Sequence, residues 1–129
     1  IKTKLHADVL CLDDFFIPSS EWPNEISPAF PFPYFRYADF IQGLQRLSNG
    51  MIFEYQAYDW SIKQLGEIKS INPENIIIVE GVSVLSEQLA PCYNKTICVM
   101  SNESNELEAI CQRENNNMKV WKELYLPSV

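Results

Sequence analysis

Two largely apolar runs in this chain end in carboxylates. Residues 7–12 lead into Asp13 and Asp14, and residues 76–79 lead into Glu80. Continuous runs rich in leucine and β-branched residues are typical of strands buried on both faces, as in a parallel sheet. Because open parallel sheets bind their ligands beyond the carboxyl ends of the strands, we expect Asp13 and Glu80 to lie side by side at that edge.

Between these two runs, the pattern predicts one helix and one hairpin. Apolar side chains recur at helical spacing over about 37–48, and Asn49-Gly50 is a good helix stop. The segments 51–58 and 66–71 read as extended and are predicted to pair with each other.

The last third of the chain is predicted to continue the alternation of helices and strands. Its expected elements are a short helix at about 83–90, a third core strand over 95–100, a helix near 103–113 and a final helix at roughly 118–125. Ser101 and Ser104 offer N-caps for the helix near 103–113. This alternation indicates the α/β class, and 129 residues are enough for one domain with its own core.

A proline-rich segment follows the first predicted strand. Residues 17–35 contain five prolines, which exclude a regular helix or a central strand. The same region is rich in aromatic residues, so we expect a long loop packed by its own aromatic side chains rather than a disordered one. Long structured loops are often functional.

Charge and hydropathy exclude two classes of partner. The net charge is −7 and no run of Lys or Arg is present, which argues against a nucleic-acid surface. The longest apolar stretches are far shorter than the ~20 residues of a membrane span, so no membrane partner is expected.

The four cysteines form no CxxC pair and His6 is the only histidine, so no zinc site is predicted. We expect all four thiols to be reduced and structural, in a cytoplasmic protein.

Five segments, in their order along the chain, carry a resemblance to a known family. They are residues 12–18, Trp22-Pro23, Tyr58-Asp59-Trp60, residues 78–82 and the stretch from Trp121 to Pro127. Together they resemble the uridine kinase family of P-loop phosphotransferases, and in particular its bacterial uridine kinase-like branch. The resemblance implies a three-layer P-loop-kinase-like α/β sandwich with a mainly parallel sheet and a small β-hairpin.

The resemblance also implies roles for the acidic residues. Asp13 would be the general base that takes the proton from the 5′-hydroxyl of a nucleoside. Glu80, together with Asp13, would hold the Mg²⁺ ion that bridges the phosphates of ATP, since magnesium prefers hard oxygen ligands. Phe16, Tyr58 and Asp14 would contact the nucleoside-like substrate.

The chain departs from the family in three respects, one of which is that the family's ribose-binding acid, before the first helix, is replaced near Arg36. It has no G-x-x-x-x-G-K-[ST] phosphate loop, whose backbone amides and lysine cradle the phosphates of ATP. A missing N-terminal segment would explain this, so we expect the chain to be the central part of a longer protein and inactive alone. Of the family's lid arginines only Arg113 is kept, as a phosphate contact, while Glu106 and Ala109 stand at matching positions.

Two alternatives to a phosphotransferase follow from these departures. One is a non-catalytic, kinase-like scaffold that binds a nucleotide, a metabolite or a protein partner. The other is a structural or dimerisation module, which uses the strand edge that a missing central strand would expose; a homo-oligomer is compatible with this sequence.

Overall fold

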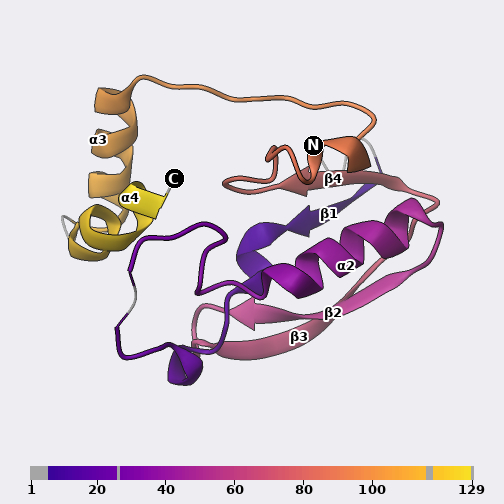
Figure 1. Ribbon diagram of the computed structural model, residues 1–129, viewed down its shortest axis with the longest axis horizontal. Coiled ribbons are helices and arrows are strands. Elements are labelled where there is room, and N and C mark those ends of the chain that lie inside the picture. Colours follow the sequence, from indigo (N-terminus) through magenta and orange to yellow (C-terminus); the bar gives the residue numbers. More distant parts are fainter. Residues whose placement is uncertain (1–5, 26, 116–117, 129) are drawn as a thin grey trace.

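Four strands in the described part of the chain form two separate two-stranded sheets (Figure 1). The structure is a computed structural model and describes residues 6–25, 27–115 and 118–128. The strands and longer helices are β1 (Ala7–Cys11), α2 (Tyr37–Ser48), β2 (Phe53–Asp59), β3 (Gln64–Ile71), β4 (Ile76–Glu80), α3 (Glu103–Arg113) and the terminal turn α4 (Leu126–Ser128). Short 3₁₀ turns are η1 (Leu12–Phe15), η2 (Ser19–Glu21) and η3 (Ala90–Cys92), and η4 (Trp121–Tyr125) is a π-helical turn that runs into α4. The fold is mixed α/β.

The first sheet pairs β1 with β4 in parallel. Its register runs from Ala7 opposite Ile76 to Cys11 opposite Glu80. Both strands therefore end at the same edge, as the sequence predicts. Parallel strands need a crossover between them, and here the crossover contains α2 and the whole β2–β3 hairpin.

The second sheet is the predicted hairpin, a ribbon in which β2 and β3 pair antiparallel. Along β2, Phe53, Tyr55 and Ala57 are buried while Glu54 and Gln56 are exposed. This alternation has the period of two expected for a strand with one face on the core.

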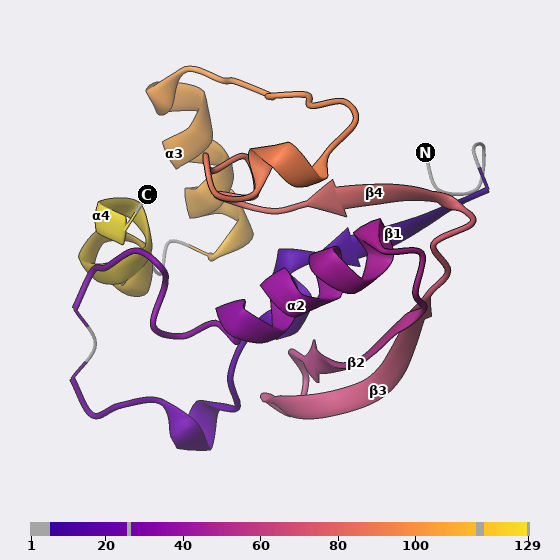
Figure 2. The same cartoon turned by 45° about the vertical axis from the view of Figure 1, so that its right-hand side comes forward.

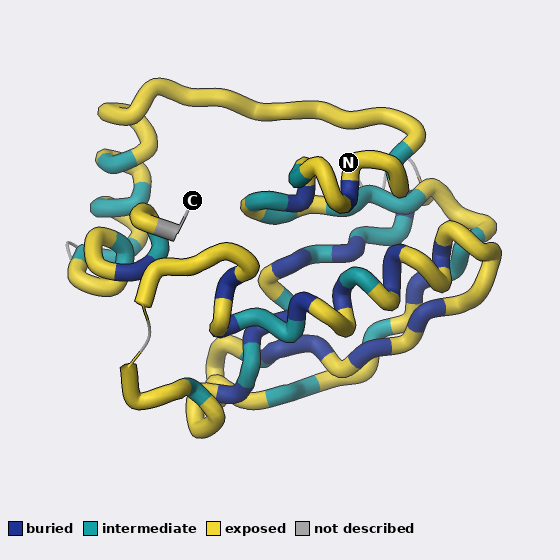
Figure 3. The backbone as a smooth tube through the Cα atoms, in the orientation of Figure 1, coloured by how far each residue is buried: buried dark blue, intermediate teal, exposed yellow. Residues whose placement is uncertain are grey.

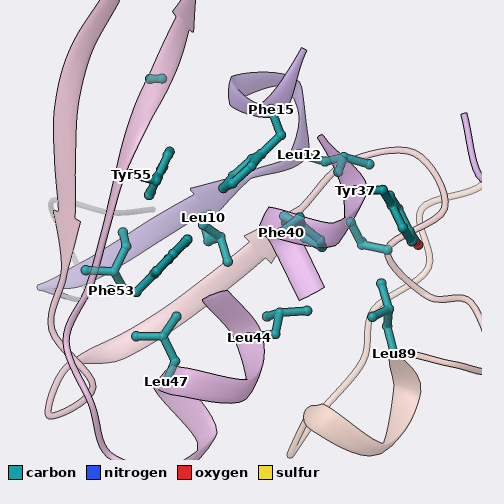
Figure 4. Packing of buried hydrophobic residues seen from close by; sticks show 13 residues of the cluster. Leu10, Leu12, Phe15, Tyr37, Phe40, Leu44, Leu47, Phe53, Tyr55 and Leu89 are labelled. Carbon is teal, nitrogen blue, oxygen red and sulfur yellow. The ribbon is translucent and has the colours of Figure 1, made fainter. Parts of the chain in front are cut away.

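Helix α2 connects the two sheets through its apolar face, and its bounds match the predicted helix. Figure 2 shows α2 between the β1–β4 pair and the ribbon. Its buried residues share one core with the side chains of β1, η1 and the ribbon (Figure 4). Leu10 on β1 and Phe40 on α2 are fully buried in that core. The predicted aromatic loop is also confirmed, since Phe16, Phe32 and Tyr34 form a second buried cluster.

The prediction of a short helix at about 83–90 is wrong. The chain makes turns there, and only Ala90–Cys92 forms a 3₁₀ turn. Gly81 and Ser83 have positive φ angles of 145° and 71°, which a right-handed helix cannot contain. The segment is nevertheless anchored, because Val84 and Leu89 are buried in the main core.

The prediction of a third core strand over 95–100 is also wrong. This segment has no strand assignment and its apolar side chains face solvent: Ile97, Val99 and Met100 are 84%, 91% and 86% exposed. Cys98 is exposed as well, so it is not the buried hydrophobe that its apolar neighbours suggested. Figures 1 and 3 show the segment as a long exposed stretch between η3 and α3. An apolar run becomes a strand only when a neighbouring strand satisfies its backbone groups, and within the described residues β4 pairs with β1 alone.

This difference can be tested by placing a charge in the segment. Val99→Asp is expected to change the free energy of unfolding by no more than about 0.5 kcal/mol, as at other exposed sites. Val84→Asp is the matched control, since it puts the same carboxylate into the core and is expected to cost more than about 2 kcal/mol. Chemical denaturation measures both. A large loss for Val99→Asp would show that the segment packs as a strand in solution.

The C-terminal helices agree with the pattern in position. Helix α3 has the predicted bounds, but its N-cap is Asn102, whose side chain accepts a hydrogen bond from the amide of Asn105, rather than Ser101 or Ser104. Leu124 of η4 packs against the aromatic cluster. Among the described helices, none combines the length and the apolar character that crossing a membrane requires. All four cysteines lie in the described part of the chain, and none of them forms a disulfide.

Candidate functional site

The structure brings Asp13 and Glu80 to one edge of the parallel sheet. Glu80 is the last residue of β4, and Asp13 belongs to η1, which begins directly after β1. Both residues are exposed at this edge. The sequence predicted this neighbourhood because the carboxyl ends of adjacent parallel strands meet there.

The pKa of the Asp13 carboxyl is raised above its ordinary value. The main cause is partial burial, which disfavours the charged form, and the negative charge of Glu80 adds to it. Arg113 opposes this rise in pKa, and Asp14 contributes a small increase. A carboxyl group with a raised pKa beside a second carboxylate is a candidate proton acceptor or metal ligand.

Cys11 links the two acidic residues. Its thiol forms a hydrogen bond with Glu80, and its sulfur accepts one from the backbone amide of Asp13. Burial and the bond to Glu80 raise the pKa of this thiol to about 12, so it is protonated and unreactive at neutral pH. From the sequence, Cys11 is expected to be a small hydrophobe in a strand, and no local signal indicates its polar contacts.

The side chain of Asp14 points to the ribbon instead. Its carboxylate accepts a hydrogen bond of 2.8 Å from the Tyr55 hydroxyl and forms an ion pair of 2.9 Å with Lys69. Burial and the bond to Asp14 raise the pKa of Tyr55. These contacts fasten η1 to β2 and β3, and they occupy the carboxylate that the resemblance assigned to substrate.

Phe16 and Tyr58 lie in the second aromatic cluster, close to one another. Their ring centroids are 5.6 Å apart, and both residues are less than a tenth exposed. Trp60 packs edge-on against both rings and is itself half exposed. The rings of Phe16 and Tyr58 therefore pack inside the cluster, and Trp60 is the most exposed of the three residues.

Arg113 lies at the end of α3 near the acidic pair. Its charge acts on Asp13, and its guanidinium stacks over the Trp121 ring at 5.0 Å and pairs with Glu114 at 3.1 Å. The side chain is 62% exposed, which leaves part of the guanidinium accessible to an anion.

The donor set for a metal ion is limited. In residues 6–25, 27–115 and 118–128, no group of three or more His, Cys, Asp or Glu side chains is arranged to hold a metal. Magnesium, however, is usually bound by one or two carboxylates together with water and substrate phosphates. Asp13 and Glu80 fit that partial ligand set.

Gly81 shapes the turn after Glu80. Its φ of 145° is rare for other residues, and a Cβ atom there would lie 2.5 Å from the Cβ of Leu12. We expect Gly81→Ala to cost about 2 kcal/mol or more, since backbone strain and a core clash add. Gly50→Ala is the control: φ is also positive, 72°, but nothing lies within 4 Å. Equal losses in denaturation would contradict the close packing of Gly81 on Leu12.

Comparison with models of protein families finds no family that matches the chain, and comparison with curated proteins finds no match either.

Proposed function

We propose that these residues belong to a uridine kinase-like phosphotransferase, which moves the γ-phosphate of ATP to the hydroxyl of a nucleoside or a similar small molecule. The observation that supports it most is the pair of carboxylates, Asp13 and Glu80, at one edge of a parallel sheet, with the pKa of Asp13 raised. The proposal includes a P-loop-kinase-like fold, of which the β1–β4 pair and the hairpin would be parts.

In this proposal Asp13 accepts the proton of the attacking hydroxyl. The raised pKa makes its carboxylate a stronger base than an ordinary aspartate. Glu80 and Asp13 would hold Mg²⁺, which neutralises charge on the phosphates of ATP. Arg113, partly free of its neighbours, would approach the transferred phosphoryl group.

The sequence contains no G-x-x-x-x-G-K-[ST] pattern. In this proposal, the residues of this chain therefore activate the acceptor hydroxyl and bind Mg²⁺. We expect the 129-residue chain to bind ATP·Mg²⁺ more weakly than about 1 mM in calorimetry. Tight binding would contradict the assignment of the phosphate loop to another segment.

The experiment that tests the function uses the natural protein that contains these residues. We expect the protein to transfer labelled phosphate from ATP to one or more of a panel of nucleosides in the presence of Mg²⁺. Absence of transfer to any hydroxyl acceptor, with the protein folded, would overturn the proposal.

The second candidate is a non-catalytic scaffold with the same fold. It is favoured by the closed packing of Phe16 and Tyr58 and by the ion pair of Arg113 with Glu114, which leave the predicted contacts engaged within the chain. Nucleotide or nucleoside binding without phosphate transfer in the same assay would identify it.

A further inference from the structure

Arg36, immediately before α2, is bound to the segment that follows Asp13. Its backbone amide donates to the carbonyl of Phe15 at 2.7 Å. Its Nη2 donates to the carbonyl of Asp14 at 3.0 Å and to that of Gln56 at 2.6 Å, and its Nε reaches the carbonyl of Phe16 at 3.4 Å. One residue thus contacts three consecutive carbonyls of this segment.

Two of these carbonyls, those of Asp14 and Phe15, belong to a turn that is weak by itself. The turn η1 is four residues long, and short 3₁₀ turns have poor hydrogen-bond geometry. The Arg36 side chain is only 17% exposed and its guanidinium stacks over the Phe15 ring at 5.3 Å. A partly buried arginine with several acceptors is held in one geometry, and so is the turn that it binds.

A second set of contacts fixes the direction of the turn. The carboxylate of Asp14 is held by Tyr55 and Lys69 on the ribbon. With Asp14 turned to the ribbon and its carbonyl bound by Arg36, the neighbouring Asp13 remains exposed at the sheet edge. The two anchors come from different elements, the start of α2 and the hairpin.

We propose that Arg36 is a positioning residue for Asp13, an inference that rests on the proposed function. Its planar fork holds the carbonyl of Asp14 in η1 together with those of Phe16 and Gln56, so that the Asp13 carboxylate stays beside Glu80. Lysine keeps the charge but has no fork, and therefore cannot hold the carbonyls of Asp14, Phe16 and Gln56 together.

The test compares Arg36→Lys with Arg46→Lys in the natural protein. Arg46 is the matched control, because it also lies in the α2 region and clamps one carbonyl, that of Ile52, through Nε at 3.3 Å and Nη2 at 3.2 Å, but outside the site. We expect Arg36→Lys to lower kcat about tenfold or more while the KM for ATP is unchanged, since a displaced base slows the chemical step. Arg46→Lys is expected to keep wild-type kcat.

A second measurement separates this inference from the proposed function. Amide hydrogen exchange over residues 13–16 is expected to become about tenfold faster in Arg36→Lys and to stay unchanged in Arg46→Lys. Two outcomes would overturn the inference and leave the function standing. In the first, Asp13→Asn abolishes turnover but Arg36→Lys does not slow turnover. In the second, Arg46→Lys slows turnover as much as Arg36→Lys does. If Asp13→Asn keeps full turnover, Asp13 is not the base and the inference fails with it, although phosphate transfer stands. If the wild type transfers no phosphate, the proposed function is overturned. Unchanged exchange in Arg36→Lys would overturn the anchoring in either case.

Discussion

Asp13→Asn is expected to reduce the turnover of the natural protein by ~10² or more. Asparagine has nearly the same shape, but its amide cannot accept the proton of an attacking hydroxyl or supply a charged oxygen to Mg²⁺. The contacts that hold the turn are made by other groups, the carboxylate of Asp14 and Arg36, so the fold is expected to persist. Steady-state kinetics with saturating ATP and nucleoside gives the ratio.

Two further variants define what this result means. Glu80→Gln is expected to raise the Mg²⁺ concentration needed for half-maximal rate, because it removes one oxygen charge from the same edge. Glu74→Gln, which changes an exposed carboxylate just before β4, is expected to leave the rate unchanged. Full turnover by Asp13→Asn would remove Asp13 from the chemistry and would require another group to accept the proton.

Asp13→Asn is also expected to change the free energy of unfolding when no divalent metal is present. Since the pKa of Asp13 is raised above 3.8 in the folded protein, the folded state binds the proton more tightly than the unfolded chain does. The wild type therefore loses free energy of unfolding as pH rises from about 3.8 through the folded pKa, and the cost persists at higher pH. Asp13→Asn avoids this cost and is expected to be the more stable protein at pH 7. An advantage of Asp13→Asn that grows toward low pH would show the opposite shift.

The largest expected effect on stability comes from Phe15→Ala, at about 3–5 kcal/mol. Phe15 is 0% exposed. Its ring stacks on Tyr55 at 4.7 Å and meets Phe40 edge-on at 5.3 Å, so it joins η1 to both β2 and α2. Truncation leaves a cavity between three elements and also removes the surface under the Arg36 guanidinium. Because domains are stable by only about 5–15 kcal/mol, the variant is expected to approach the limit of folding.

Phe30→Ala is the matched control for this measurement. Phe30 is half exposed in the proline-rich loop, where its ring contacts Phe32 and Tyr37 edge-on. We expect it to cost about 1 kcal/mol, the usual value for a point substitution. Urea denaturation followed by circular dichroism measures both variants. A loss for Phe15→Ala no greater than that for Phe30→Ala would contradict the described core.

The contacts that hold η1 were not predictable from the sequence. For Arg36 the resemblance indicates only that a ribose-binding acid is replaced there, and Lys69 lies in a predicted extended segment. Their partners are 22 and 55 residues away in the sequence. Only the packing of α2 and the ribbon around η1 brings these groups within hydrogen-bond distance.

The sequence by itself determined the elements whose pattern is local, namely β1, α2, the hairpin, β4 and α3, and the shared edge of Asp13 and Glu80. Periodicity acts over neighbouring residues and can be read directly, and the parallel-strand rule then places the ends of two paired strands at one edge whatever their separation in the sequence. The tertiary structure decided that residues 95–100 remain exposed, that Cys11 lies between two acidic groups, and that Asp14 turns to the ribbon. These outcomes depend on which groups from distant segments are available as partners, and the local pattern carries no information about that.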